Sequence, residues 1–209
     1  MTTTPSAFNP AMVAWAKGDG LVPAVVQDVH SLRVLMLGYM NREALQATLE
    51  TGLVTFFSRS KQRIWQKGET SGHVLKLHSV KLDCDQDTLL VMAEPQGPTC
   101  HNGTVTCWGD DEGPSLATLA DLAATIKKRH TQPEAGSYTA KLFESGLARI
   151  AQKVGEEGVE TALAGATKAP NLKDEAADLL YHLLVLLEAS GTSLDDVLTV
   201  LHERSRRKK

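Results

Sequence analysis

The chain has 209 residues, enough for one large domain or for two of about 100 residues each. Hydrophobic residues make up 42% of it, charged residues 22%, and the formal net charge is −3, which excludes broad electrostatic attraction to nucleic acid or to an anionic membrane. The N-terminus has no signal-peptide pattern, and no run of about 18 apolar residues occurs. We therefore expect a cytoplasmic protein that binds neither nucleic acid nor a membrane.

The first half of the chain contains short apolar runs rich in β-branched residues, which predict strands over residues 21–29, 33–40, 53–60, 73–84 and 88–95. Between the second and third runs, Asn41 can cap a short helix. Alternation in the fourth run predicts that Val74, Lys76, His78 and Val80 share one face, with Leu75, Leu77 and Ser79 on the other.

The segment WGDDEGPS at 108–115 is polar and contains glycine and proline, a composition typical of a linker. After it, the apolar residues recur at helical spacing. Ser115, Ser137 and Ser193 can cap helices, and residues 144–164 and 172–189 form long helical stretches. We therefore predict two domains: a β-rich α+β domain over residues 1–112 and an all-α helical bundle over 113–209.

Three aspartates alternate with other residues in KLDCDQDTLL at 81–90. If this segment is a strand, Asp83, Asp85 and Asp87 share one face and Cys84 points to the other. Like charges this close are unfavourable unless a cation neutralises them, and ligands that are all oxygen suit Mg²⁺. The alternative is a solvated acidic edge.

The three cysteines form a second candidate metal site. Cys100 and Cys107 flank the turn-forming HNGTVT, which lets two thiolates converge on one ion with Cys84 as a third ligand. Three protein ligands leave a fourth tetrahedral position for water, as in catalytic zinc sites. The alternative is that the three thiols are buried and act as small hydrophobic groups.

Together with MLGYMNREAL and SRSKQRIWQKGETSGH, these motifs make residues 10–109 similar to phosphoribosyl-AMP cyclohydrolase of histidine biosynthesis. The resemblance implies that water is added at C6 to open the adenine ring of a phosphoribosyl nucleotide. It also implies Mg²⁺ at the three aspartates and Zn²⁺ at the three cysteines, in a homodimer whose zinc ligands come from both chains. Bound zinc would supply hydroxide at neutral pH.

Proton transfer to the ring requires a nearby acid or base. The first candidate is His101 and the second is His73. The alternative is a structural role, which is the more common one for a lone histidine. The motif KGETSGH resembles a substrate loop that allows close backbone approach and meets phosphate oxygens. Its candidate substrate-binding residues are Lys67, Gly68, Glu69, Thr70, Ser71 and Gly72. Trp65 could stack on the base, and Arg59 and Arg63 could pair with phosphate. The alternative is a plain hairpin connection with solvated arginines.

Carboxylates recur at helical spacing in KVGEEGVETALAG at 153–165 and in LKDEAADLLYHLL at 172–184. Glu157 and Glu160 are three residues apart, and Glu175 and Asp178 repeat this spacing on the next helix. Their neighbours are apolar or small, so the acids border the packed face. Carboxylates on facing helices hold divalent metals in bundles, whereas the alternative is a solvated acidic face.

This pattern resembles the all-α nucleotide pyrophosphohydrolases, and over residues 115–205 it is similar to phosphoribosyl-ATP pyrophosphatase. The resemblance implies Mg²⁺ ligands at Glu157, Glu160, Glu175 and Asp178. It further implies that Glu156 is another ligand or orients water and that Lys153 pairs with a phosphate.

The combined hypothesis is a bifunctional hydrolase that converts phosphoribosyl-ATP to phosphoribosyl-AMP and pyrophosphate, and then opens the ring of phosphoribosyl-AMP. Two rivals remain. Only one of the domains could be active, or the first could be a zinc-stabilised nucleotide-binding or scaffold module without catalysis.

Overall fold

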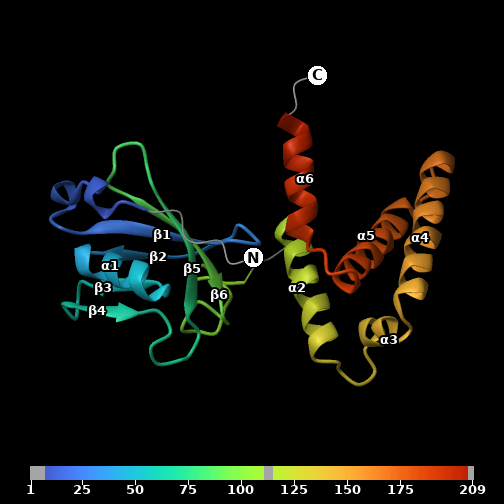
Figure 1. Cartoon of the computed structure of the whole chain (residues 1–209), viewed down its shortest axis with the longest axis horizontal. Helices are drawn as coiled ribbons and strands as arrows, with labels where there is room; N and C mark the ends of the chain where they lie inside the picture. The colour runs from blue at the N-terminus through green and yellow to red at the C-terminus, as the bar shows by residue number, and fades with distance from the viewer. Residues whose placement is uncertain (1–7, 111–114, 207–209) are drawn as a thin grey trace. The chain divides into compact units, whose positions relative to one another are not determined.

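The computed structural model describes residues 8–110 and 115–206, which form two compact units divided at Ala117 and Thr118. The first unit is rich in strands, and the second, from α2 to α6, is entirely helical (Figure 1). The predicted fold class is therefore confirmed. The predicted boundary between residues 112 and 113 lies outside the described residues.

A four-stranded sheet organises the first unit, in the order β2-β1-β6-β5. Its strands are β1 (Val22–Asp28), β2 (Val34–Met40), β5 (Leu75–Leu82) and β6 (Leu89–Pro95). The β1–β6 pair is parallel, whereas β1–β2 and β5–β6 are antiparallel. The fully buried Val22, Val26, Leu35, Leu89 and Val91 fill much of its core.

A second sheet pairs β3 (Thr55–Ser58) with β4 (Arg63–Gln66). Sequence reasoning missed β4, because its four residues are flanked by polar side chains and show little alternation. Cross-strand pairing places Trp65 opposite Phe56, and their rings lie 5.2 Å apart. This contact helps to place the segment that carries the candidate substrate loop.

Helix α1 (Arg42–Thr51) begins at the predicted cap, where the Asn41 side chain accepts a hydrogen bond from Ala44 N at 2.8 Å. The buried Thr48 hydroxyl donates to the Ala44 carbonyl and accepts from Thr55 N at 2.9 Å. The helix is thereby tied to the start of β3. Two short 3₁₀ helices, η1 (Pro10–Met12) and η2 (Trp15–Gly18), precede the sheet.

The predicted faces of β5 are wrong beyond Leu77. A bulge lies between Leu77 and Ser79, and it shifts the register against β6. Because a bulge adds one residue to one strand, it reverses the alternation that follows. Val80 is consequently 5% exposed and joins Leu75 in the core instead of sharing the face of Lys76.

The second unit consists of α2 (Ala117–Thr131), α3 (Tyr138–Glu144), α4 (Leu147–Thr167), α5 (Leu172–Ala189) and α6 (Leu194–Arg206). Ser137 and Ser193 cap α3 and α6 as predicted, by accepting hydrogen bonds from Ala140 N and Asp196 N. Helices α4 and α5 pack along each other. The core is formed by Ile126, Leu142, Ile150, Leu184 and Val185. Among the described helices, none is long and apolar enough to cross a membrane.

Gly38 in β2 gives a test of this packing. A Cβ atom at Gly38 would lie 2.3 Å from the ring of Phe56, which is completely buried. We expect Gly38→Ala to lower the free energy of unfolding of the first unit by about 1–3 kcal/mol, because the buried ring must move. Urea denaturation followed by tryptophan fluorescence measures this change.

The matched control is Gly18→Ala, since nothing lies within 4 Å of a Cβ atom there. We expect this variant to unfold at nearly the wild-type urea concentration. Equal stability of the two variants would contradict the packing of Phe56 against β2.

Candidate functional sites

The three aspartates lie in the loop between β5 and β6, so the predicted strand through Cys84, Asp85 and Asp87 is wrong. The loop closes because the backbone N–H groups of Asp87 and Thr88 donate to Asp83 Oδ1 at 3.0 and 3.1 Å. One carboxylate oxygen from each aspartate nevertheless lies within 4.8 Å of the others. The loop, and not strand alternation, brings the acids together.

Lys17 of η2 faces this acidic loop, a contact that sequence reasoning missed. Its Nζ lies 2.8 Å from Asp85 Oδ2 and 3.5 Å from Asp87 Oδ2, and it donates to the Asp85 carbonyl at 2.7 Å. The hydrogen bond to Asp85 raises the pKa of Lys17. Burial acts to raise the pKa of Asp83, but the bonds from Thr88 and Asp87 outweigh it and lower this pKa.

Cys100 and Cys107 lie close together in the segment that follows β6. Hydrogen bonds from the Asn102 backbone and from the Thr104 hydroxyl lower the pKa of Cys100, whereas burial raises the pKa of Cys107. Cys84 is exposed in the β5–β6 loop. Among the residues that the structure describes, no cysteine belongs to a converging group of three metal-binding side chains. The three thiols therefore do not meet within one chain.

The substrate loop predicted at 67–73 turns back beside these thiols. Gly68 has a φ of +86°, and a Cβ atom there would lie 2.5 Å from the His73 carbonyl oxygen, so this turn requires glycine. Lys67 Nζ donates to that carbonyl at 3.2 Å. Burial lowers the pKa of Lys67, whereas negative charge on Cys107 and Cys100 would raise it. Both thiols act on the Lys67 ammonium because they lie near it.

The two candidate catalytic histidines lie in this same region. The ring of His73 packs against Gly97, where a Cβ atom would come within 2.7 Å of it. His101 Nδ1 is 3.8 Å from Cys100 Sγ. Both imidazoles therefore border the thiol-bearing segment, as proton transfer near it would require.

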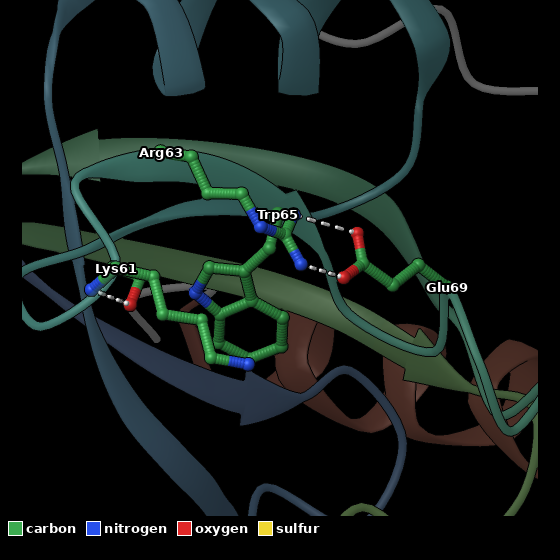
Figure 2. A pocket seen from close by; sticks show the side chains of 5 residues that line it. Lys61, Arg63, Trp65 and Glu69 are labelled. Atoms are coloured by element: carbon green, nitrogen blue, oxygen red, sulfur yellow. Dashed lines mark hydrogen bonds and ion pairs between the residues drawn. The ribbon is translucent and has the colours of Figure 1, made fainter.

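A pocket of about 250 Å³ lies beside the substrate loop and is lined by Ser58, Lys61, Arg63, Trp65 and Glu69 (Figure 2). Arg63 Nη2 pairs with Glu69 Oε1 at 2.5 Å at the wall of this pocket (Figure 2). The other predicted arginine, Arg59, does not line the pocket and lies over the Tyr39 ring at 3.9 Å. Sequence reasoning missed Ser58 and Lys61, although the motif SRSK contains both.

In the helical unit, Glu157 of α4 converges with Glu175 and Asp178 of α5, with ligand oxygens within 4.8 Å of one another. Glu157 is only 5% exposed, so the predicted position at the border of the packed face is right for this residue. The Glu160 side chain is exposed overall. Partial loss of water around its carboxyl group, together with the charges of Glu157 and Glu175, raises its pKa. It therefore lies beside the three converging acids.

Glu156 belongs to a different network, in which Arg149, Gln152 and Lys153 contact its carboxylate at 3.3, 2.8 and 2.9 Å. Lys153 Nζ also lies 2.7 Å from Glu157 Oε1. These bonds raise the pKa of Lys153, with the Glu157 bond contributing most. Lys153 thus joins the three converging acids to Glu156.

His182 of α5 completes the surroundings of this cluster, and sequence reasoning treated it only as an interruption of an apolar run. It is 4% exposed, and its Nδ1 lies 2.9 Å from the Asp178 carbonyl oxygen and 3.7 Å from Glu157 Oε1. Its Nε2 lies 3.2 Å from the Tyr138 hydroxyl of α3. The spacing of four residues from Asp178 was the signal that could have found it.

Comparison with known proteins assigns each of the two units to a protein family. Residues 36–109 match the family described as phosphoribosyl-AMP cyclohydrolase, and residues 119–205 match phosphoribosyl-ATP pyrophosphohydrolase. The chain is 60% identical over 193 residues to the histidine biosynthesis bifunctional protein HisIE of Xylella fastidiosa (strain Temecula1), covering 92% of each chain.

The protein of the same name from Vibrio cholerae is 58% identical, with 93% of this chain and 94% of the relative covered. That of Shewanella oneidensis is 56% identical over 99% of this chain and 98% of the relative. The chain therefore belongs to the family of bifunctional histidine biosynthesis proteins, with a phosphoribosyl-AMP cyclohydrolase domain followed by a phosphoribosyl-ATP pyrophosphohydrolase domain.

Proposed function

We propose that the helical unit hydrolyses phosphoribosyl-ATP to phosphoribosyl-AMP and pyrophosphate, and that the strand-rich unit then opens the adenine ring of phosphoribosyl-AMP. The observation that carries the proposal is the position of the candidate groups. Each unit matches one of the two hydrolase families and gathers three carboxylates within 4.8 Å, and the first unit adds a pair of thiols.

The pyrophosphohydrolase site would hold Mg²⁺ on Glu157, Glu160, Glu175 and Asp178. The convergence of three carboxylates from two helices supports this, because one of them is buried and their mutual repulsion favours a divalent cation. Bound Mg²⁺ would stabilise the negative charge on the phosphate chain. Lys153 would pair with a phosphate, and Glu156, which Lys153 holds, would orient the attacking water.

The cyclohydrolase site would hold Mg²⁺ on Asp83, Asp85 and Asp87 and Zn²⁺ on Cys84, Cys100 and Cys107. The lowered pKa of Cys100 supports zinc binding, since the thiolate is the form that binds metal. Bound zinc would lower the pKa of water to about 7.

The substrate would bind between the thiols and the pocket of Figure 2. His101 or His73 would transfer a proton to the ring nitrogen, since both border the thiol-bearing segment. Trp65 offers a ring for the base to stack on, and Lys61 and Arg63 offer cations for phosphate at the pocket wall. Lys67 lies beside the thiols, and the Gly68 turn brings the loop backbone close to this region.

We further propose a homodimer in which Cys84 of one chain completes the zinc site of the other. The separation of Cys84 from the other two thiols within one chain supports this arrangement. Exposed apolar side chains also favour association of the helical unit, because Val159 and Leu163 on α4 are each 60% exposed.

Two substitutions should separate the activities. We expect Cys107→Ser to reduce ring opening by at least about 100-fold and to leave pyrophosphate release unchanged, whereas Asp178→Asn should do the reverse. Each removes one proposed ligand at a different metal. Pyrophosphate release and the ring-opening absorbance change, measured on the same sample, distinguish the two effects. Loss of both activities in a folded variant would rule out independent sites.

Mixing two inactive variants tests whether zinc ligands are shared. Cys84→Ser and Cys107→Ser should each lack ring opening and bound zinc as pure proteins. After they are unfolded and refolded together, half of the dimers are mixed and each regains one intact site, so about a quarter of the wild-type activity and zinc should return.

The control is Cys84→Ser refolded with a Cys84→Ser/Cys107→Ser double variant, in which no intact site can form. A mixture that recovers nothing, although wild-type protein refolds under the same conditions, would show that one chain supplies all the ligands.

Lys17 should compete with the divalent ion at the acidic loop, because its ammonium contacts Asp85 and Asp87. We expect Lys17→Met to bind Mn²⁺ at this loop severalfold more tightly, measured by calorimetry in a background in which Asp178→Asn disables the helical site. Lys61→Met, which removes a lysine from the pocket, is the matched control and should not change Mn²⁺ affinity. Weaker binding in Lys17→Met would contradict competition.

A further inference from the structure

We infer that His182 is a positioning residue for the pyrophosphohydrolase site, where it fixes the carboxylate of Glu157 relative to Asp178. The inference rests on the proposed Mg²⁺ site. His182 is a buried titratable group between three helices, and neither the sequence pattern nor the reaction outlined above assigns it a role.

The hydrogen bonds of His182 determine its orientation. The Asp178 carbonyl oxygen can only accept, so the Nδ1 atom at 2.9 Å carries a hydrogen and donates it. Nε2, on the far side of the ring, lies 3.2 Å from the Tyr138 hydroxyl. The imidazole is therefore held between α3 and the backbone of the residue whose side chain is a proposed metal ligand.

The same Nδ1 atom lies 3.7 Å from Glu157 Oε1, the oxygen that Lys153 Nζ contacts at 2.7 Å. Lys153 therefore pairs with this oxygen, and the buried His182 ring lies beside it while its N–H is donated to the Asp178 carbonyl. Contacts on this oxygen limit the rotation of the carboxylate group. Groups that hold metal ligands in this way typically contribute 10- to 100-fold to metal affinity.

The alternative role for His182 is packing alone, through its aromatic contacts. Its ring meets the Tyr181 ring edge to face with centroids 5.0 Å apart, and the Tyr138 ring with centroids 6.2 Å apart. A packing role requires a side chain of similar volume, whereas a positioning role requires the Nδ1 donor. The two roles therefore predict different results for substitutions that keep the volume but not the donor.

The test compares His182→Leu, which keeps an apolar volume, with His182→Asn, whose amide nitrogen can take the place of Nδ1. Mn²⁺ binding without substrate is measured by electron paramagnetic resonance, in an Asp85→Asn background that disables the acidic loop. We expect His182→Leu to bind Mn²⁺ about 10- to 100-fold more weakly and His182→Asn to restore most of the affinity. In the chain that retains Asp85, His182→Leu should need more Mg²⁺ for pyrophosphate release, with ring opening unchanged.

His202→Leu, at an exposed histidine on α6, is the matched control and should bind Mn²⁺ like the parent. Unchanged affinity in His182→Leu would overturn the inference. Equal loss in His182→Leu and His182→Asn, with equally lowered Tm, would trace the loss to a less stable helical unit and would also overturn the inference. Asp178→Asn tests the metal site itself: if this variant keeps full Mn²⁺ affinity, the proposed site is wrong, whatever His182 does.

Discussion

Repulsion between like charges is the constraint on which both candidate sites depend. Each unit holds three carboxylates with oxygens within 4.8 Å of one another, an arrangement that favours binding of a cation. In both units a lysine ammonium already lies against the cluster, Lys17 at the acidic loop and Lys153 at the helix pair. The structure therefore compensates part of the charge with the chain's own cations, and the remainder favours a divalent ion.

The two units meet this constraint with different architectures. At the loop between β5 and β6 the acids are largely exposed, and backbone N–H groups orient Asp83. At the helix pair, Glu157 is buried, so its orientation depends on side chains of the interior. Burial strengthens each of these contacts and also makes the loss of one costly. The helical site accordingly includes buried and half-buried polar side chains, Lys153 and His182, that contact or adjoin Glu157. The exposed loop is oriented by backbone N–H groups instead.

The positions of the three thiols are the basis of the proposed dimer. Cys84 lies on the acidic loop, whereas Cys100 and Cys107 lie on the segment after β6, beside the Lys67 turn. A zinc ion that uses all three would connect the loop of one chain to the segment of another. Catalysis at this site would then require the dimer, while the carboxylates of the helical site already converge within a single chain.

The sequence by itself determined the order and class of the two units and the residue types at each site. It did so because helical spacing is local: residues three and four apart on α4 and α5 share a face wherever the helices pack. The caps at Asn41, Ser137 and Ser193 are local in the same sense. Only the tertiary structure decided the loop conformation of the aspartates, the bulge in β5, and the contacts of Lys17 and His182. The bulge, the contacts of Lys17 with the acidic loop and the contact of His182 with Tyr138 each join segments distant in the chain, which no local pattern specifies. The loop of the aspartates is closed by short-range hydrogen bonds to Asp83, but the alternation of residue types in this segment predicts a strand there.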